Sequence, residues 1–220
     1  MALLDYELKQ SVACLQFDDG KANVVSHALI DALNEGLDRA QAEAQAIVLL
    51  GMRGKFSAGF DLEEFKKGPE ASAALVNRGG RLMHRIFTLP MPVVAGCTGH
   101  AIAAGAFMLL ACDIRIGIDG PYKIGANESV LGMTLPTFAS ELIEYRVPRN
   151  RLDRVVLKAE LMAPSAALAC GFLDEIVEEG NLVKYAQEVA ANLAAYPGQG
   201  YAGNKHLLRN GFASRILASL

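Results

Sequence analysis

Strand-like and helix-like segments alternate through the first two thirds of this chain. The run Val12–Phe17 is apolar and stops at Asp18-Asp19-Gly20, which is typical of a strand followed by a turn. Residues 46–52 (AIVLLGM) have the pattern of a buried strand, and residues 27–45 and 71–89 carry apolar side chains at helical spacing. Ser26 is suited to cap the first of these helices. Such alternation predicts an α/β protein.

The same patterns predict the remaining elements. Further strands are expected at residues 6–10, 92–97, 113–118, 122–125 and 173–177, and further helices at 61–67, 104–112, 137–145, 149–158, 165–170, 182–195 and 203–220. Residues 51–59 and 98–105 are expected to be loops. No linker-like stretch divides the 220 residues, of which 52% are hydrophobic. We therefore expect one domain over 1–220, with a core and assembly helices over about 1–195 and a short C-terminal helix over 196–220.

Charge and cysteine usage exclude several classes of function. The net charge is −3 without a run of basic residues, so neither nucleic acid nor an anionic membrane is an expected partner. The apolar stretch 101–111 is too short to span a bilayer, and the N-terminus lacks a signal-peptide pattern. The four cysteines form no CxxC pair and the histidines lack metal-ligand spacing. These features predict a cytoplasmic protein without a metal.

Two segments rich in glycine and other small residues have the composition of ligand-binding turns. One is Gly54-Lys55-Phe56-Ser57-Ala58-Gly59-Phe60-Asp61-Leu62, and the other runs from Gly99 to Ala106. Each follows a predicted strand and leads into a predicted helix, whose first N–H groups can stabilise negative charge. Small side chains let a ligand reach the backbone. Ordinary strand-to-helix turns would have the same composition, so the pattern alone leaves both interpretations open.

The motifs resemble those of the crotonase superfamily. FSAGFDL (56–62) is similar to the family's AGxD loop, and PVVAGCTGHAIAAGAFMLLACDIRI (92–116) is similar to its second signature. Lys21-Ala22-Asn23 stands where the family's N-terminal motif opens, and PSAALACGFLDEIV (164–177) matches a later family stretch. The resemblance covers roughly residues 5–210. Members usually continue for about one more helix, so contacts from that helix are not carried over.

The resemblance implies a crotonase-type spiral of ββα units with a helical C-terminal trimerisation region. It also implies an acyl-coenzyme A thioester as substrate, no separate cofactor, and a homotrimer or a dimer of trimers. The thioester oxygen would be bound by the N–H groups of Phe60 and Ala104, where the family usually has glycine at the second position. Other residues implied to contact substrate are Ala22, Ala58, Asp61, Leu62, His100, Gly105 and Phe107. Backbone donors of this kind stabilise an enolate by about 3–4 kcal/mol each.

The acidic residues favour one reaction of the family over another. Family hydratases place two glutamates over the substrate, and one of those positions is Phe107 in this chain. The other falls on Glu128 in IGANESVLGMTLP (124–136), which resembles the loop of single-glutamate enoyl-CoA isomerases. One carboxylate suits a proton shuttle, whereas water addition is easier with two. We expect Glu128 to lie among Ile124, Val130, Leu131 and Phe107, with a raised pKa.

Three functional hypotheses follow from these positions. The first is an enoyl-CoA isomerase of fatty-acid degradation that moves a double bond from the 3- to the 2-position. The second is a hydratase or another thioester-processing crotonase with Glu128 as its sole acid and base. The third is a catalytically silent acyl-CoA-binding subunit, which Phe107 would favour.

For several further residues, the sequence gives a weaker indication of a functional role. His100 could contact substrate, although a structural role fits it better, and Phe107 is most simply a core residue. Asp61 is suited to cap the short helix after the first loop. Lys66, Lys67 and Lys205 could meet coenzyme A phosphates or lie on a solvated face. The absence of serine at 103–106 disfavours a serine-nucleophile hydrolase.

Overall fold

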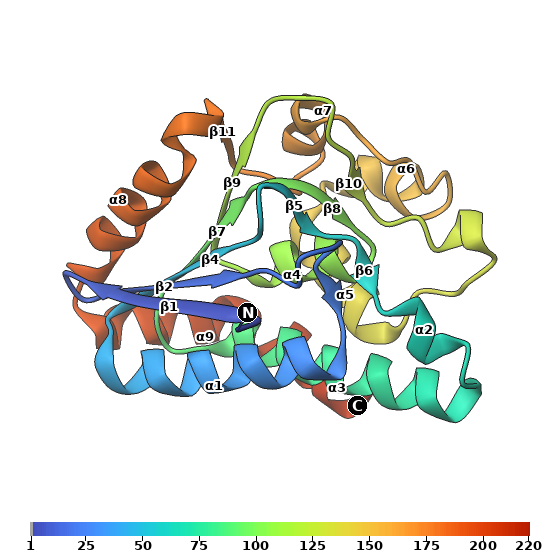
Figure 1. Cartoon of the computed structure of the whole chain (residues 1–220), viewed down its shortest axis with the longest axis horizontal. Helices are drawn as coiled ribbons and strands as arrows, with labels where there is room; N and C mark the ends of the chain where they lie inside the picture. The colour runs from blue at the N-terminus through green and yellow to red at the C-terminus, as the bar shows by residue number, and fades with distance from the viewer. Residues whose placement is uncertain (1) are drawn as a thin grey trace.

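The computed structural model describes residues 2–220 (Figure 1). Its strands are β1 (Leu4–Lys9), β2 (Val12–Phe17), β3 (Val24–Val25), β4 (Ala46–Leu50), β5 (Gly54–Ser57), β6 (Gly59–Phe60), β7 (Val93–Cys97), β8 (Gly99–Ile102), β9 (Ile114–Ile118), β10 (Ile124–Gly125) and β11 (Glu175–Val177). Its α-helices are α1 (His27–Glu43), α2 (Leu62–Phe65), α3 (Pro69–Thr88), α4 (Ala104–Ala111), α5 (Thr137–Arg146), α6 (Leu152–Val156), α7 (Pro164–Ala169), α8 (Leu182–Ala194) and α9 (Gly198–Ala218).

Successive strand pairs wind between two sheets. The six-stranded sheet has the order β1-β2-β4-β7-β9-β11, in which only β1 and β2 are antiparallel. The three-stranded sheet has the order β10-β8-β5 and is parallel. Each turn of the chain adds one strand to each sheet, because β4 precedes β5, β7 precedes β8, and β9 precedes β10. This winding confirms the predicted spiral of ββα units.

The helices cover both faces of the large sheet (Figure 1). Helix α8 packs against β2, β4, β7 and β9, whereas α1 packs against β1 and β2. Helix α4 is buried along its whole length, so it is apolar on every side. Helix α9 lies against α3 and α5. The site loops therefore rest on a rigid, well-packed interior.

Helix caps formed where the sequence indicated them. The Ser26 hydroxyl accepts a hydrogen bond from Leu29 N at 3.2 Å, and the Asp61 carboxylate accepts one from Glu63 N at 3.0 Å. Both side chains satisfy N–H groups that a helix start leaves without an intrahelical acceptor.

Some element predictions were wrong. Residues 51–59 and 98–105, expected as loops, contain β5, the start of β6 and all of β8. These strands are too short to show an alternating pattern, and glycines interrupt them. The helix expected at 149–158 divides into a 3-10 turn (Arg149–Arg151) and α6. Helix α9 begins at Gly198, five residues before the expected start at 203. Glycines in its first turns have low helix propensity, so the residue pattern showed no sign of a helix there.

Candidate active site

The first loop turns the Phe60 amide away from its neighbouring strand. Ala58 N donates to Ala22 O at 3.1 Å, and Asp61 N donates to Val25 O at 3.3 Å. Strand β6 pairs with β3 alone, with Phe60 opposite Val25. Alternate amides of a strand point to opposite sides, so the Phe60 N–H points away from β3 while that of Asp61 points towards it.

The second loop presents the first amide of α4. Ala103 N donates to Gly125 O at 2.9 Å, and Ala103 O accepts from Phe107 N at 3.0 Å. Ala104 is the first residue of α4, so its N–H has no acceptor within the helix. Among residues 2–220 its N–H also has no backbone acceptor outside the helix. This donor is therefore available at a helix N-terminus, where the helix dipole favours negative charge.

The two loops touch each other. Gly59 has a φ of +102°, and a Cβ atom there would lie 3.1 Å from Ala103 Cβ and 3.7 Å from Ala104 N. On the inner side, a Cβ atom at Gly105 would collide with the backbone oxygen of Ser57. Glycine at both positions thus permits the close approach of the loops. The Phe60 and Ala104 amides are brought into one small region, as a two-donor oxyanion hole requires.

Glu128 is a buried carboxylate that forms no ion pair with any described residue. Only 7% of the residue is exposed, and its Oε2 atom accepts no hydrogen bond from the described residues. Burial raises the pKa of the Glu128 carboxyl, and the N–H groups of Glu128 and Asn127 offset that rise in part. Glu128 follows Gly125 by three residues, and the Gly125 carbonyl is hydrogen-bonded to Ala103. The carboxylate is therefore carried by a segment that is tied to the second loop.

The surroundings of Glu128 differ from the expected apolar cluster. Val130 and Leu131 are 71% and 57% exposed, because they lie on a short 3-10 helix (Ser129–Leu131) that follows Glu128 at the surface. Ile124 and Phe107 are buried as expected. The Phe107 ring packs edge-on against Phe138, with ring centroids 6.2 Å apart. The position that could hold a second carboxylate is filled by this aromatic packing.

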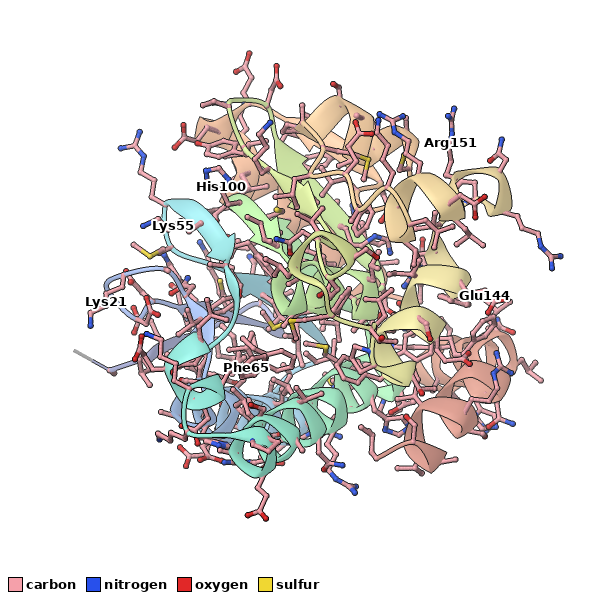
Figure 2. All side chains as sticks on the ribbon, turned by 90° about the vertical axis from the view of Figure 1, so that its right-hand side faces the viewer. Lys21, Lys55, Phe65, His100, Glu144 and Arg151 are labelled. Atoms are coloured by element: carbon pink, nitrogen blue, oxygen red, sulfur yellow. The ribbon has the colours of Figure 1, made fainter. Side chains whose placement is uncertain are left out.

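The other predicted contact residues lie around the two loops with different exposure. Ala58 and Leu62 are exposed, whereas Ala22 and Asp61 are half-buried. His100 lies opposite Lys55 in the β5–β8 pairing, and its Nδ1 accepts from Lys123 N at 3.0 Å. This contact gives His100 a structural role. Figure 2 shows Lys21, Lys55 and His100 on the same side of the molecule, and Lys55 Nζ donates to Lys21 O at 2.5 Å.

The three candidate lysines have other partners. Lys66 and Lys67 are exposed and form ion pairs with Glu63 and Glu64 on and beside α2. Lys205 is buried and pairs with Asp113 at 2.8 Å, so the expectation that it reaches coenzyme A or solvent was wrong. An aspartate far away in the sequence holds it inside the protein.

Sequence reasoning missed three residues that shape the loops. Asn23 is fully buried, and its side chain bonds to Asp19 N at 2.9 Å and Phe17 O at 2.9 Å, which orders the segment around Ala22. Ser57 Oγ accepts from Gly59 N at 3.3 Å. Ala103 has a φ of +50° and a ψ of −122°, a conformation that suits glycine better than alanine. Of these three residues, only Asn23 lies next to a recognisable sequence pattern, the Asp-Asp-Gly turn.

The described part of the chain contains no cluster of three or more His, Cys, Asp or Glu side chains placed to hold a metal ion. None of the helices within residues 2–220 is long and apolar enough to cross a membrane. A cavity of about 610 Å³ opens away from the two loops, between α5, α8 and α9.

The ββα spiral brings two backbone N–H groups into neighbouring loops and buries a glutamate on a segment tied to one of them. The enoyl-CoA hydratase/isomerase family model matches residues 7–218, and the chain belongs to this family. A probable enoyl-CoA hydratase of Bacillus subtilis is 31% identical, covering 94% of this chain and 82% of the relative. The chain is therefore an enzyme of the hydratase/isomerase type.

Solved structures agree with this assignment. An enoyl-CoA hydratase/isomerase family protein from Pseudomonas syringae superposes with a TM-score of 0.96 at 36% identity, covering 99% of this chain and 94% of that one. Human mitochondrial delta3-delta2-enoyl-CoA isomerase has a TM-score of 0.93 at 26% identity, covering 98% and 86%. Similarity thus extends to proteins named for either reaction, and the choice between them depends on the site.

Proposed function

We propose that this protein is an enoyl-CoA isomerase that converts 3-enoyl-CoA esters of fatty-acid degradation to 2-enoyl-CoA esters. The observation that supports this choice is the buried carboxylate of Glu128, which forms no ion pair among the described residues, together with Phe107 at the position where a hydratase would have its second carboxylate. Proton transfer between two carbons needs one group that first accepts and then donates. A hydratase would also need a group to position water, and Phe107 has no polar atom.

In the proposed reaction, the ionised Glu128 carboxylate removes a proton from C2 of the 3-enoyl thioester. The electron pair of that C–H bond becomes part of a dienolate whose negative charge lies largely on the thioester oxygen. The N–H groups of Phe60 and Ala104 donate to this oxygen, each worth about 3–4 kcal/mol. Glu128 returns the proton to C4, and the double bond then lies between C2 and C3. The raised pKa of Glu128 suits the first step, since it makes the carboxylate a better base.

The proposal is tested by following two reactions with one preparation. Short-, medium- and long-chain 3-enoyl-CoA esters are assayed for double-bond migration, and 2-enoyl-CoA esters are assayed for hydration. Isomerisation should be faster than hydration for at least one chain length. A substrate deuterated at C2 should carry part of its label to C4, because the buried carboxyl exchanges slowly with water. Faster hydration throughout would refute the isomerase proposal. If the protein binds thioesters but turns none of them over, it is better explained as a silent acyl-CoA-binding subunit.

We further propose that the protein assembles as a homotrimer or a dimer of trimers, with α5 and the segment around α6 near the subunit contacts. Exposed apolar side chains at Leu157 of that segment and at Leu207 and Leu208 of α9 support association. Light scattering at micromolar concentration should give a mass near three or six times 23.5 kDa. A stable monomer would contradict the assembly and leave the isomerase proposal standing.

A further inference from the structure

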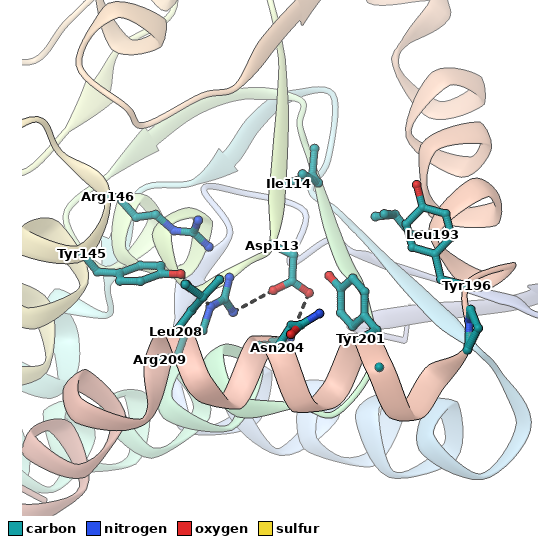
Figure 3. A pocket seen from close by; sticks show the side chains of 13 residues that line it. Asp113, Ile114, Tyr145, Arg146, Leu193, Tyr196, Tyr201, Asn204, Leu208 and Arg209 are labelled. Atoms are coloured by element: carbon teal, nitrogen blue, oxygen red, sulfur yellow. Dashed lines mark hydrogen bonds and ion pairs between the residues drawn. The ribbon is translucent and has the colours of Figure 1, made fainter.

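The cavity of about 610 Å³ lies beside Asp113 and Ile114, where β9 begins just after the C-terminal end of α4 (Figure 3). Its walls are mainly apolar and aromatic, and they come from α5, α8, α9, the start of β9 and the turn between α8 and α9. They include Ile114, Tyr145, Leu193, Tyr196, Tyr201 and Leu208. The volume lies within the range of about 300–1,000 Å³ that is usual for small-molecule sites. A ligand with an apolar body would fit these walls.

The floor of the cavity carries one carboxylate between two cations. Asp113 accepts from Lys205 Nζ at 2.8 Å and from Val93 N at 2.7 Å through Oδ2. Arg209 Nη1 lies 2.7 Å from Asp113 Oδ1, although the two make no well-aligned hydrogen bond. All three side chains are about 6% exposed. Figure 3 shows Asp113 at the centre of the cavity, facing α9.

Arg146 adds a third cation with no carboxylate of its own. Its guanidinium donates to the carbonyls of Leu110, at 3.1 Å, and Cys112. Among the described residues it forms no ion pair within 4.0 Å. Its neighbour Arg115 is already paired with Asp174 at 2.5 Å. The cavity therefore has three cations, Arg146, Lys205 and Arg209, against the single charge of Asp113, an excess of two positive charges.

The pKa values of these groups agree with an excess of positive charge. Burial, followed by the charges of Arg115 and Arg209, lowers the pKa of Arg146 to about 9. Burial also lowers the pKa of Lys205 to about 8, even though Asp113 opposes this shift. Buried cations without enough counter-charge are unfavourable unless an anion reaches them.

We propose that this cavity binds an organic carboxylate with an aromatic or aliphatic body. The carboxylate would lie against Arg146 and beside Lys205, and the body would pack on the tyrosine and leucine side chains of the walls. Arginine is suited to this role because its planar guanidinium can donate two parallel hydrogen bonds to a carboxylate. The site is separate from Glu128 and from the two backbone donors, so its occupation does not depend on the isomerase reaction.

Two glycines of α9 provide a matched pair of variants. Gly200 lines the cavity, and a Cβ atom there would have no heavy atom within 4 Å. Gly200→Phe should therefore place a ring at the wall of the cavity without a clash, and we expect it to obstruct a ligand. Gly203 also has open space around it and is not part of the lining. Gly203→Phe is the control for adding the same side chain to the same helix.

The test is a calorimetric titration of the whole protein with 4-phenylbutyrate and with its neutral analogue 4-phenylbutanol. The acid should bind at one site per chain, at least about tenfold more tightly than the alcohol, because charge-assisted hydrogen bonds are lost with the alcohol. Arg146→Gln should weaken binding of the acid about tenfold or more, and Arg149→Gln, an exposed neighbour, should not. Gly200→Phe should abolish binding, whereas Gly203→Phe and Glu128→Gln should bind as the wild type does.

Several results would overturn the proposal. These are equal affinity for the acid and the alcohol, no saturable binding of the acid, or unchanged binding in Gly200→Phe. Loss of binding in Glu128→Gln would place the probe at the other site. If the acid fails to bind and Gly200→Phe dissociates an oligomer, the cavity is a contact between copies of the chain. Thermal melts check folding, and if Arg146→Gln does not fold, the pair of glycine variants decides.

Discussion

At the scale of single residues, two buried carboxylates have opposite environments. Asp113 is surrounded by Lys205 and Arg209, so its negative charge is stabilised inside the protein. Glu128 has no cationic partner among residues 2–220, and its burial raises its pKa. A structural carboxylate is usually paired with cations, as Asp113 is. A carboxylate that must take up and release a proton is better left unpaired. This contrast is why Glu128 is assigned the chemistry.

Replacing Glu128 by glutamine should remove the proton shuttle while keeping the shape of the side chain. We expect turnover of 3-enoyl-CoA to fall by about 10²–10⁴-fold, the usual contribution of a positioned acid or base. Affinity for the thioester should stay close to that of the wild type. Steady-state kinetics and a binding titration measure the two effects, with the exposed Glu144→Gln as the control. A Glu128→Gln enzyme as fast as the wild type would exclude this mechanism.

The raised pKa of Glu128 also predicts a dependence on pH. The carboxylate must be ionised to accept the C2 proton, so activity should fall on acidification, and at a higher pH than for an ordinary glutamate. A raised pKa in the folded state means that ionisation lowers stability as the pH rises through that pKa. Glu128→Gln should therefore be more stable than the wild type at neutral pH, and the difference should shrink in acid. Urea unfolding at several pH values measures it, and a constant difference would contradict the assignment.

At the scale of the elements, the site depends on contact between β6 and the start of α4. Gly59 and Gly105 allow this contact, because side chains there would meet Ala103 and Ser57. The contact lies between segments about 45 residues apart in the chain, and paired strands of the small sheet, β5 and β8, bring them together. Errors in this pairing would separate the two donors.

Gly59→Ala should therefore impair catalysis more than folding. The added methyl group would lie 3.1 Å from Ala103 Cβ and 3.2 Å from Ile102 O, and the φ of +102° is unfavourable for alanine. We expect turnover to fall by about tenfold or more as the two N–H groups move apart. Gly20→Ala is the matched control, since Gly20 also has a positive φ, of +71°, with no atom within 4 Å of the added methyl. Equal activity of the two variants would mean that the N–H donors do not depend on the contact between β6 and the start of α4.

Local patterns predicted the large elements and both side-chain caps, because their signals lie within a few residues of each other. The strands that position the donors were missed, since β6 has two residues and β5 and β8 have four each, which is too few to show a periodicity. The pairing of Asp113 with Lys205 spans 92 residues and has no local signal. Val130 and Leu131 were expected inside because they are apolar, although a surface turn holds them outside. The positions of Glu128, Phe60 and Ala104 came from motif resemblance.

At the scale of the whole molecule, α9 is joined to the spiral core through a buried ion cluster. Lys205 and Arg209 of α9 meet Asp113 at the start of β9, and Arg209 also donates to Phe87 O at the end of α3. Arg215 extends the attachment to Glu141 on α5. These contacts lie along one side of α9, while Leu207 and Leu208 on the same helix are exposed. The helix is therefore held by charge as well as by apolar packing.

Asp113→Asn should destabilise the protein strongly. The change leaves Lys205 and Arg209 buried without their carboxylate, a loss of about 3–5 kcal/mol in the free energy of unfolding. Asp38→Asn is the control, because Asp38 is 73% exposed and its pair with Arg85 is worth about 0–1 kcal/mol. Urea unfolding measures both variants. Adding Lys205→Met to Asp113→Asn should restore part of the stability by removing one unpaired charge. Similar losses for Asp113→Asn and Asp38→Asn would mean that the cluster does not hold α9 in place.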